Sequence, residues 1–295
     1  MTDFKNVHVI ANPVSGQDEP VIAIINRAFS QISFKWDISV TQGYGDGAKY
    51  AKQAVDNGAD LICVYGGDGT VNDVLNGLYP SSVPMAMLSG GTGNGAAKAL
   101  GIIGELENSI KYIVNGNNEV LLVDIGKIAD RLFLLRVDIG KIVTFTEQQE
   151  RKDKDDFGMM AYLFAIAKSF TNKKDYEFTI TLDGKTVDRS AGVFILLNMS
   201  RRNAPDSAKD TSIQPADGVF NVFLLESSLS DTLKGITSFA QVTKTEEMFA
   251  ELTGKEIRVE TPEPLLVLAD GEPCGETPIT VELLPQAINL LVPKQ

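Results

Sequence analysis

The chain of 295 residues has few of the residues that build disulfide frameworks, histidine chemistry or membrane spans. Its two cysteines, Cys63 and Cys274, stand far apart and form no metal-ligand spacing, which favours a reduced compartment. His8, the sole histidine, lies in the alternation of the first apolar run, so we expect no histidine catalysis, and a zinc hydrolase would lack ligands. No apolar run reaches the roughly 20 residues that span a bilayer, and the first residues lack a signal-peptide pattern. We therefore expect a cytoplasmic protein without a transmembrane segment.

Positive charge is also scarce. Lysine and arginine total 27 against 39 acidic residues, which gives a net charge of −12. A field of that sign repels phosphate backbones and anionic membrane surfaces, so it excludes nucleic acid as a partner and a polybasic membrane anchor. The apolar content of 43% is typical of a globular protein, and the length suffices for two domains. Any anionic ligand must therefore be held by local groups.

The first third of the chain repeats a short apolar run, a polar or glycine-rich loop and a helical pattern. The repeats are VHVIANPVSGQ, WDISVTQGYGDGAKYAKQAV, LICVYGGDGT and VPMAMLSGGTGNGAAKAL. This alternation predicts an α/β domain built on an open parallel sheet. Ligands of such sheets bind at the carboxyl ends of the strands, so we expect the four loops along one edge.

After Asn115 the sequence changes to short β-type runs separated by Asp-Gly, proline and asparagine-rich turns. This pattern predicts an antiparallel β-sandwich. We place the first domain at residues 1–120 and the sandwich domain at residues 121–285, and the last residues, 286–295, are candidates for a return to the first domain.

Two segments of the second half stand out from the β pattern. The hexapeptide VDIGKI occurs from Val123 and again from Val137, and it predicts two neighbouring strands rather than a repeat architecture. Residues 157–170 form an apolar helical pattern that either packs against the sandwich or contacts lipid. At about 14 residues this helix is too short to span a bilayer.

The stretch LICVYGGDGTVNDVLNGL joins a buried run to a helical pattern through two glycines and Asp68. Gly66 and Gly67 let the backbone approach a ligand, and the N-terminus of the following helix favours phosphate. Asp68 would repel that phosphate unless a divalent cation lies between them, so the loop predicts a nucleoside triphosphate with Mg²⁺. The alternative is a tight turn in which Asp68 caps the helix that follows it.

Two other loops of the first domain carry groups suited to phosphate. Asn12, Ser15 and Gly16 follow the first apolar run, and Thr92 and Asn94 follow the fourth. Taken singly, each set is also compatible with an ordinary polar loop. Convergence of three such loops on one sheet edge favours a phosphate site.

The C-terminal part supplies a further acid. Asp270 and Gly271 have the sequence of a hairpin turn, and Glu272 follows directly. The pattern by itself predicts only a turn with an exposed glutamate.

The motifs together resemble a known family. They are NPVSG, GGDGT followed by Val71 and Asn72, GTGN, a DG after Pro215, and the ending DGEP with TP and ELLPQAINLLVP. In this order they resemble the soluble lipid kinases of the diacylglycerol kinase catalytic-domain family, over essentially the whole chain. The resemblance implies an ATP- and Mg²⁺-dependent kinase that phosphorylates the hydroxyl of a diacylglycerol-like lipid in phospholipid synthesis. It also implies an ATP-binding α/β domain, a β-sandwich lipid-substrate domain and an active site in the cleft between them.

The resemblance further implies a peripheral protein that meets its lipid substrate at the inner face of the membrane. Exposed sandwich edges would allow a homodimer. The family's ATP contacts, carried over by position, fall on four segments of the first domain. They are Asn12, Pro13, Val14, Ser15, Gly16, Thr41, Gly66, Gly67, Asp68, Gly69, Thr70, Val71, Asn72 and Thr92.

The resemblance also assigns catalytic and metal-binding roles. Glu272 would be the general base that takes the proton from the lipid hydroxyl, Asp68 would work with Mg²⁺ and the phosphates, and Asp270 would lie beside the base. A structural Mg²⁺ in the second domain would fall on three positions, of which only the second brings a carboxylate and the others offer main-chain carbonyls. These positions are Gln214, Asp217 and Val219.

The sequence departs from the family at Gly95, where the family's GTxND motif has an aspartate. We interpret the chain as a divergent or slow kinase, because Asp68 and Glu272 are both kept. Two alternatives stay open. One is an NAD kinase-like enzyme for a soluble acceptor, which would share GGDGT, and the other is a nucleotide-binding regulator without phosphate transfer.

Overall fold

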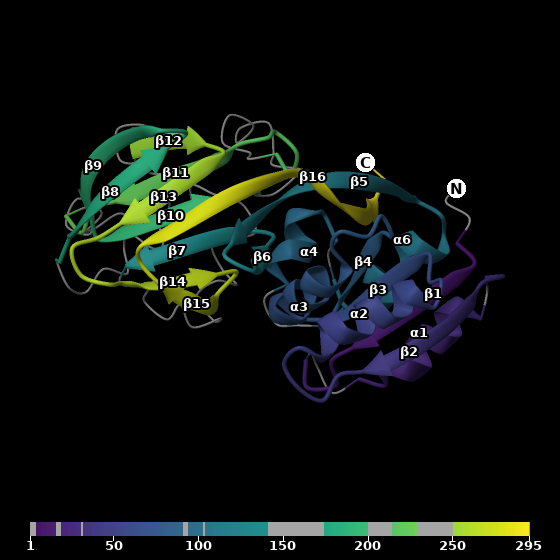
Figure 1. The fold of residues 1–295 in the computed structure, drawn as a ribbon. Coiled ribbons are helices and arrows are strands. Elements are labelled where there is room, and N and C mark those ends of the chain that lie inside the picture. Colours follow the sequence, from purple (N-terminus) through teal and green to yellow (C-terminus); the bar gives the residue numbers. More distant parts are fainter. Residues whose placement is uncertain are drawn as a thin grey trace, which may run out of the picture. The chain divides into compact units, whose positions relative to one another are not determined.

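The chain divides into two units, Met1–Ile125 with Pro285–Gln295, and Gly126–Leu284. Two strands, β5 (Asn118–Ile128) and β16 (Ile279–Pro293), have residues in both units. Figure 1 labels the elements. This computed structural model describes residues 4–15, 19–30, 32–90, 94–102, 104–140, 174–199, 214–228 and 250–294.

The first unit is an α/β unit on a parallel sheet, as predicted. Strands pair in the order β2-β1-β3-β4-β16, and each of these neighbouring pairs is parallel. The elements in chain order are β1 (Asn6–Ala11), α1 (Val21–Phe29), β2 (Lys35–Val40), α2 (Asp46–Asp56), β3 (Leu61–Gly66), α3 (Asp68–Leu78), β4 (Met85–Ser89), α4 (Gly95–Ala99), α5 (Leu106–Ser109) and α6 (Lys111–Val114).

The strand order explains where the helices lie. The chain passes from β1 to β2 on one side and then to β3 on the other, so right-handed crossovers place α1 on the opposite face from α2 and α3. Strands β3 and β4 are buried at every residue because both faces are covered. The order reverses between β1 and β3, and a ligand crevice of such a sheet lies at that switch point.

The second unit is a β-sandwich, which confirms the predicted fold class. Its first sheet pairs β16, β13, β8 and β9, and its second has the order β12-β11-β10-β7-β14-β15, with antiparallel registers in both. The remaining strands are β6 (Arg131–Phe133), β7 (Arg136–Gly140), β8 (Tyr176–Leu182), β9 (Lys185–Ala191), β10 (Val193–Leu197), β11 (Phe220–Leu225), β12 (Ala250–Gly254), β13 (Glu256–Glu260), β14 (Leu266–Ala269) and β15 (Glu272–Glu276).

Aromatic side chains fill the space between the two sheets. The rings of Phe178 on β8 and Phe194 on β10 lie 6.0 Å apart, and both residues belong to one buried cluster with residues of the other strands. The alternating inward residues of both sheets therefore form a single core. No helix in the described parts of the chain is long and apolar enough to cross a membrane. The predicted helix at residues 157–170 lies outside the described residues.

The two VDIGKI copies are strands, but the prediction that they neighbour each other was wrong. The first copy lies in β5, which pairs with β16 and β6, and the second begins in β7, which pairs with β10 and β14. A short identical sequence fixes the strand conformation, whereas its partners are set by the rest of the fold.

Candidate functional site

The first and third of the four predicted loops of the α/β unit are joined at its switch point. The Asn12 side chain donates from Nδ2 to Thr70 Oγ1 at 3.0 Å, and its Oδ1 accepts the amide of Val14 at 3.0 Å. The backbone amide of Asn12 donates to the carbonyl of Tyr65 at 2.9 Å. The loop after β1 is thus fixed to both β3 and α3. Val14, on this loop, is 91% exposed.

Asp68 caps a helix, but the helix is α4 and not α3, which the alternative interpretation of the loop names. Its Oδ2 accepts the amide of Gly95 at 2.8 Å and its Oδ1 accepts the amide of Ala96 at 2.9 Å. These are the first two amides of α4, so the carboxylate interacts favourably with free N–H groups at a helix start. Helix α3, which Asp68 begins, has Gly67 at its cap position and no side-chain cap bond. Asp68 therefore ties the GGDGT segment to the fourth loop.

A second acid of α3, Asp73, binds the start of helix α2 in the same way. Asp73 accepts the amide of Gly47, in the first turn of α2, at 2.8 Å. Helices α2 and α3 also cross closely, because a Cβ at Gly77 would fall on the backbone of Ala48. Through Asp68, Thr70 and Asp73, helix α3 therefore contacts the loops or helices that follow β1, β2 and β4.

Several of the predicted ATP-contact residues have buried side chains. Thr41 is 8% exposed, and its hydroxyl donates to the carbonyl of Ala11 at an Oγ1-to-O distance of 3.4 Å. Val71 and Asn72 are buried as well, at 5% and 3% exposed. These three side chains face the interior, so contact with a ligand would have to come from other groups of the same loops. Gly16 and Thr92 lie outside the described residues.

Gly66, at the strand-to-helix junction, leaves no room for a side chain. A Cβ on Gly66 would meet the side chain of Thr70, the hydroxyl of which receives the Asn12 amide. Any larger residue would displace that threonine and break the link to the first loop. Gly67 and Gly69 extend the same junction, where the backbone is free of bulky side chains.

The predicted hairpin at the C-terminal acid pair is confirmed. Asp270 and Gly271 have φ angles of 50° and 86° between β14 and β15, as a type I′ turn requires. The Asp270 carboxylate accepts three backbone amides, from Leu134 at 2.7 Å, Leu135 at 2.8 Å and Arg136 at 2.9 Å. Asp270 thus holds the turn between β6 and β7. Glu272 begins β15 and is exposed.

Sequence reasoning missed Arg131, which reaches the strand that carries Glu272. Its Nη1 donates to the carbonyl of Pro273 at 2.9 Å, and its Nε is buried without a hydrogen-bond partner in the described structure. Burial raises the pKa of the Cys274 thiol, and the guanidinium of Arg131 opposes that increase. No motif in the sequence marks Arg131, because the contact joins residues that are far apart along the chain.

The predicted structural metal positions lie in one turn of the second unit. Asp217 Oδ1 accepts the amide of Val219 at 3.2 Å, and Gly218 between them has a φ of 75°. Gln214 and Asp217 are both exposed. Among the described residues, no group of three or more His, Cys, Asp or Glu side chains could hold a metal ion. A metal at this turn would depend on one carboxylate and on carbonyl oxygens.

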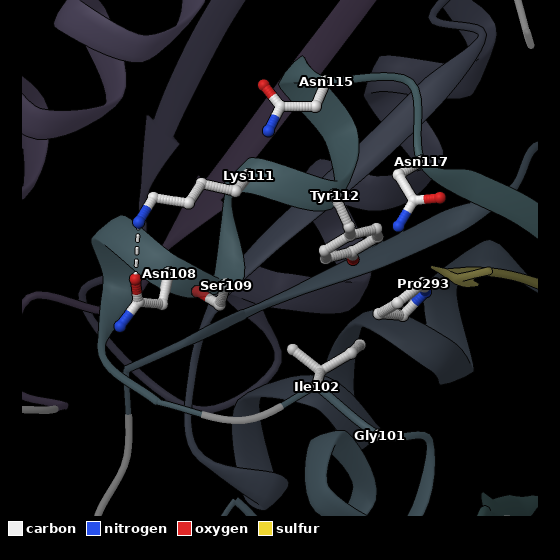
Figure 2. Close-up of a pocket in the computed structure, with 9 residues that line it drawn as sticks. All are labelled: Gly101, Ile102, Asn108, Ser109, Lys111, Tyr112, Asn115, Asn117 and Pro293. Atoms are coloured by element: carbon white, nitrogen blue, oxygen red, sulfur yellow. Dashed lines mark hydrogen bonds between the residues drawn. The ribbon is translucent and has the colours of Figure 1, made fainter. Parts of the chain in front are cut away.

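An open pocket of about 270 Å³ lies elsewhere in the first unit. Figure 2 shows its lining, which includes Tyr112 and Lys111 from α6 and Pro293 from the end of β16. Lys111 Nζ donates to Asn108 Oδ1 at 2.7 Å, so the one cation of the lining is paired within it. None of the predicted site residues lines this pocket.

Two family models match the chain. The model described as the diacylglycerol kinase catalytic domain matches residues 6–128. The model described as the YegS C-terminal NAD kinase beta sandwich-like domain matches residues 144–292. The matched ranges thus include the loops of the α/β unit and the hairpin with Glu272.

Curated relatives and solved structures match over nearly the full chain. A "Putative lipid kinase" of Staphylococcus epidermidis (strain ATCC 12228) is 26% identical over 92% of this chain and 90% of its own length. Another "Putative lipid kinase", of Staphylococcus aureus (strain Newman), is 28% identical over the same shares. A crystal structure of a "putative diacylglycerol kinase" from Bacillus anthracis str. Sterne has a TM-score of 0.75 and 26% identity, covering 99% of this chain and 98% of that one.

Proposed function

Because the chain belongs to the diacylglycerol kinase catalytic-domain family, with the YegS-type C-terminal domain, we propose that it phosphorylates a lipid hydroxyl. The donor is ATP with Mg²⁺, and the acceptor is a diacylglycerol-like lipid met at the membrane surface by a peripheral, cytoplasmic protein. The observation that carries the proposal is the junction at α3, where Asn12, Thr70 and Asp68 join three loops of one sheet edge. Such loops suit a ligand with several phosphates.

The first-unit residues would bind and orient the nucleotide. Backbone amides at the start of α3, residues 67–69, lie where glycines and a helix start allow close approach to phosphate oxygens. Asp68 would act first as a positioning residue, because both of its oxygens already hold amides of α4. Phosphoryl transfer needs mainly positioning and charge neutralisation, so a rigid set of loops supplies much of what the reaction requires.

Magnesium, when bound with ATP, would neutralise charge on the transferring phosphoryl group. Asp68 is the acid of the first unit placed for that role, since a carboxylate oxygen can accept an amide and still have a lone pair for a cation. The turn at Gln214, Asp217 and Val219 would hold a separate structural ion through oxygen donors of the type that Mg²⁺ prefers.

Glu272 would take the proton from the acceptor hydroxyl. It is exposed at the start of β15, and its carboxylate forms no hydrogen bond or ion pair among the described residues, so it is free to accept a proton. Asp270 and Arg131 would position it, the first by fixing the hairpin turn and the second by binding the Pro273 carbonyl next to it. A general base needs this freedom together with a fixed backbone.

One observation favours each alternative function. The second unit matches a domain described as NAD kinase beta sandwich-like, which keeps a soluble acceptor open. Gly95 gives only its amide, to Asp68, where the family has an acid, which keeps a nucleotide-binding regulator open. The lipid kinase function is favoured by the named relatives, which match over 92% of the chain and therefore over both units.

The test is transfer of labelled phosphate from ATP to a panel of acceptors. The panel holds diacylglycerol, phosphatidylglycerol, sphingoid bases, prenols and NAD, with and without Mg²⁺. We expect a lipid product that requires Mg²⁺ and that Glu272→Gln reduces by about 100-fold or more, the usual contribution of a general base. Nucleotide binding by this variant should be unchanged.

Each other result has a defined meaning. Labelling of NAD alone would show the soluble-acceptor function, and ATP binding without any product would show the regulator. Turnover of Glu272→Gln equal to that of the parent chain would remove Glu272 as the base while leaving the kinase assignment intact. A large gain in turnover for Gly95→Asp would show that the missing acid limits the rate.

A further inference from the structure

Tyr44 is an exposed aromatic side chain on the loop between β2 and α2. Its side chain is 84% exposed, whereas most large apolar residues of the unit are buried. The loop follows the carboxyl end of β2, next to the loop of Asn12, because Thr41 donates its amide to the carbonyl of Ala11 at 2.9 Å. Removing an aromatic ring from water is favourable, so a ligand that covers the ring gains binding free energy.

The loop that carries Tyr44 is held in place by two carboxylates. Asp46 Oδ2 accepts the amides of Gln42 at 2.8 Å and Gly43 at 3.1 Å. Asp73, from helix α3, accepts the amide of Gly47 at 2.8 Å. The backbone on both sides of Tyr44 is therefore fixed, so a ligand that covers the ring would not have to order the loop first.

The glycines beside Tyr44 leave space around its ring. A Cβ placed on Gly43 or Gly45 would have no atom within 4 Å, and Gly45 has a φ of 86° that favours glycine. A flat ligand therefore has room to approach. Among the described residues of the loops that follow β1, β2, β3 and β4 at this edge, no other aromatic side chain is exposed.

We propose that the base of the nucleotide stacks on Tyr44, so that this residue sets the contribution of the base to binding. The inference rests on the nucleotide use proposed above and adds to it. The backbone amides at the start of α3, residues 67–69, suit the phosphate end of a nucleotide, and the loop after β2 supplies the apolar surface for its other end. Thr41 is buried at the start of that loop, so Tyr44 presents the larger surface.

The test compares two ligands that differ by the nucleoside. Binding of Mg·ATP and of Mg·tripolyphosphate to the full chain is measured by calorimetry for the parent chain, Tyr44→Ala and Tyr44→Phe. We expect Tyr44→Ala to weaken ATP binding by about tenfold, the usual size of a base-stacking contact, and to leave tripolyphosphate binding unchanged. Tyr44→Phe keeps the ring and should bind ATP nearly as well as the parent chain.

Ile22→Ala is the matched control, because Ile22, on α1, is also an exposed apolar residue of the first unit, at 56%, and is none of the predicted nucleotide contacts. It should not change the ratio of the two affinities. The proposal is overturned if Tyr44→Ala leaves ATP binding unchanged or weakens both ligands equally, or if it instead lowers binding to phosphatidylglycerol vesicles alone. If the parent chain binds neither ligand, the proposed ATP use itself fails, and the stacking role with it.

Discussion

The hydrogen bonds of Asp68 lead to a prediction about two backbone amides. If Asp68 caps α4, then Asp68→Asn should loosen the start of that helix in the protein without nucleotide or Mg²⁺. The asparagine keeps one acceptor oxygen, but it loses the charge and turns an NH₂ group toward one of the two amide donors, Gly95 or Ala96. A residue that served only as a metal ligand would show no such effect in the absence of metal.

The expected size follows from the two contacts. Hydrogen bonds to a charged group contribute about 1.5–3 kcal/mol each, and Asp68 is half-buried, so the lower end of that range applies. A loss of about 1.4 kcal/mol makes local opening about tenfold more frequent. We therefore expect the amides of Gly95 and Ala96 to exchange with solvent deuterium about tenfold faster in Asp68→Asn.

The assay is amide exchange followed residue by residue by NMR. Asp73→Asn is the matched control, because it removes the same kind of contact from the amide of Gly47 and should speed exchange there alone. The reasoning would be refuted if Asp68→Asn left the exchange of Gly95 and Ala96 unchanged. It would also fail if either variant affected both helices equally, since that result reports general loosening of α3.

Three further predictions concern stability and reactivity. Gly77→Ala should destabilise the first unit by about 1–3 kcal/mol in urea unfolding, because its Cβ would meet the Ala48 backbone; a stabilised variant would show that the two helices separate at no cost. Asp183 has a lowered pKa because it accepts backbone amides, so Asp183→Asn should be less stable than the parent chain at pH 6. Acid unfolding curves should show this difference vanish as the pH falls through the lowered pKa of Asp183. Arg131→Gln should raise the pKa of the Cys274 thiol, which moves the pH midpoint of its alkylation by iodoacetamide upward; an unchanged midpoint would contradict the charge effect.

The sequence patterns predicted the fold class better than the contacts of individual residues. Apolar runs alternating with glycine loops predicted the parallel sheet, because strands and helices each leave a local periodicity in the sequence. The motif also placed Asp68 at a strand-to-helix junction, as observed. It could not show that the carboxylate reaches Gly95, because that contact links loops that meet only when the sheet has formed.

The repeated VDIGKI sequence shows the same limit in another way. Asp124, in the first copy, accepts the amide of Gln286 at 2.7 Å, while Asp138, in the second, pairs with Arg136 at 2.9 Å. The two glycines also differ, since a Cβ on Gly126 would fall on the Phe133 ring, whereas Gly140 has a φ of 109°. Identical residues therefore have different partners: Asp124 binds an amide 162 residues along the chain, whereas Asp138 pairs with an arginine of its own strand.

The position of the acid in the glycine loop has a physical explanation that does not require a metal. A carboxylate at the start of α3 is attracted by the free amides of α4, and Asp73 near the middle of α3 is attracted in the same way by α2. The loop therefore holds an anion before any ligand binds, and that anion belongs to the protein. A consequence is that the Gly95 and Ala96 amides are not free for phosphate, so the phosphate contacts must come from other backbone groups of this edge, with Mg²⁺ offsetting the charge of Asp68 when nucleotide binds.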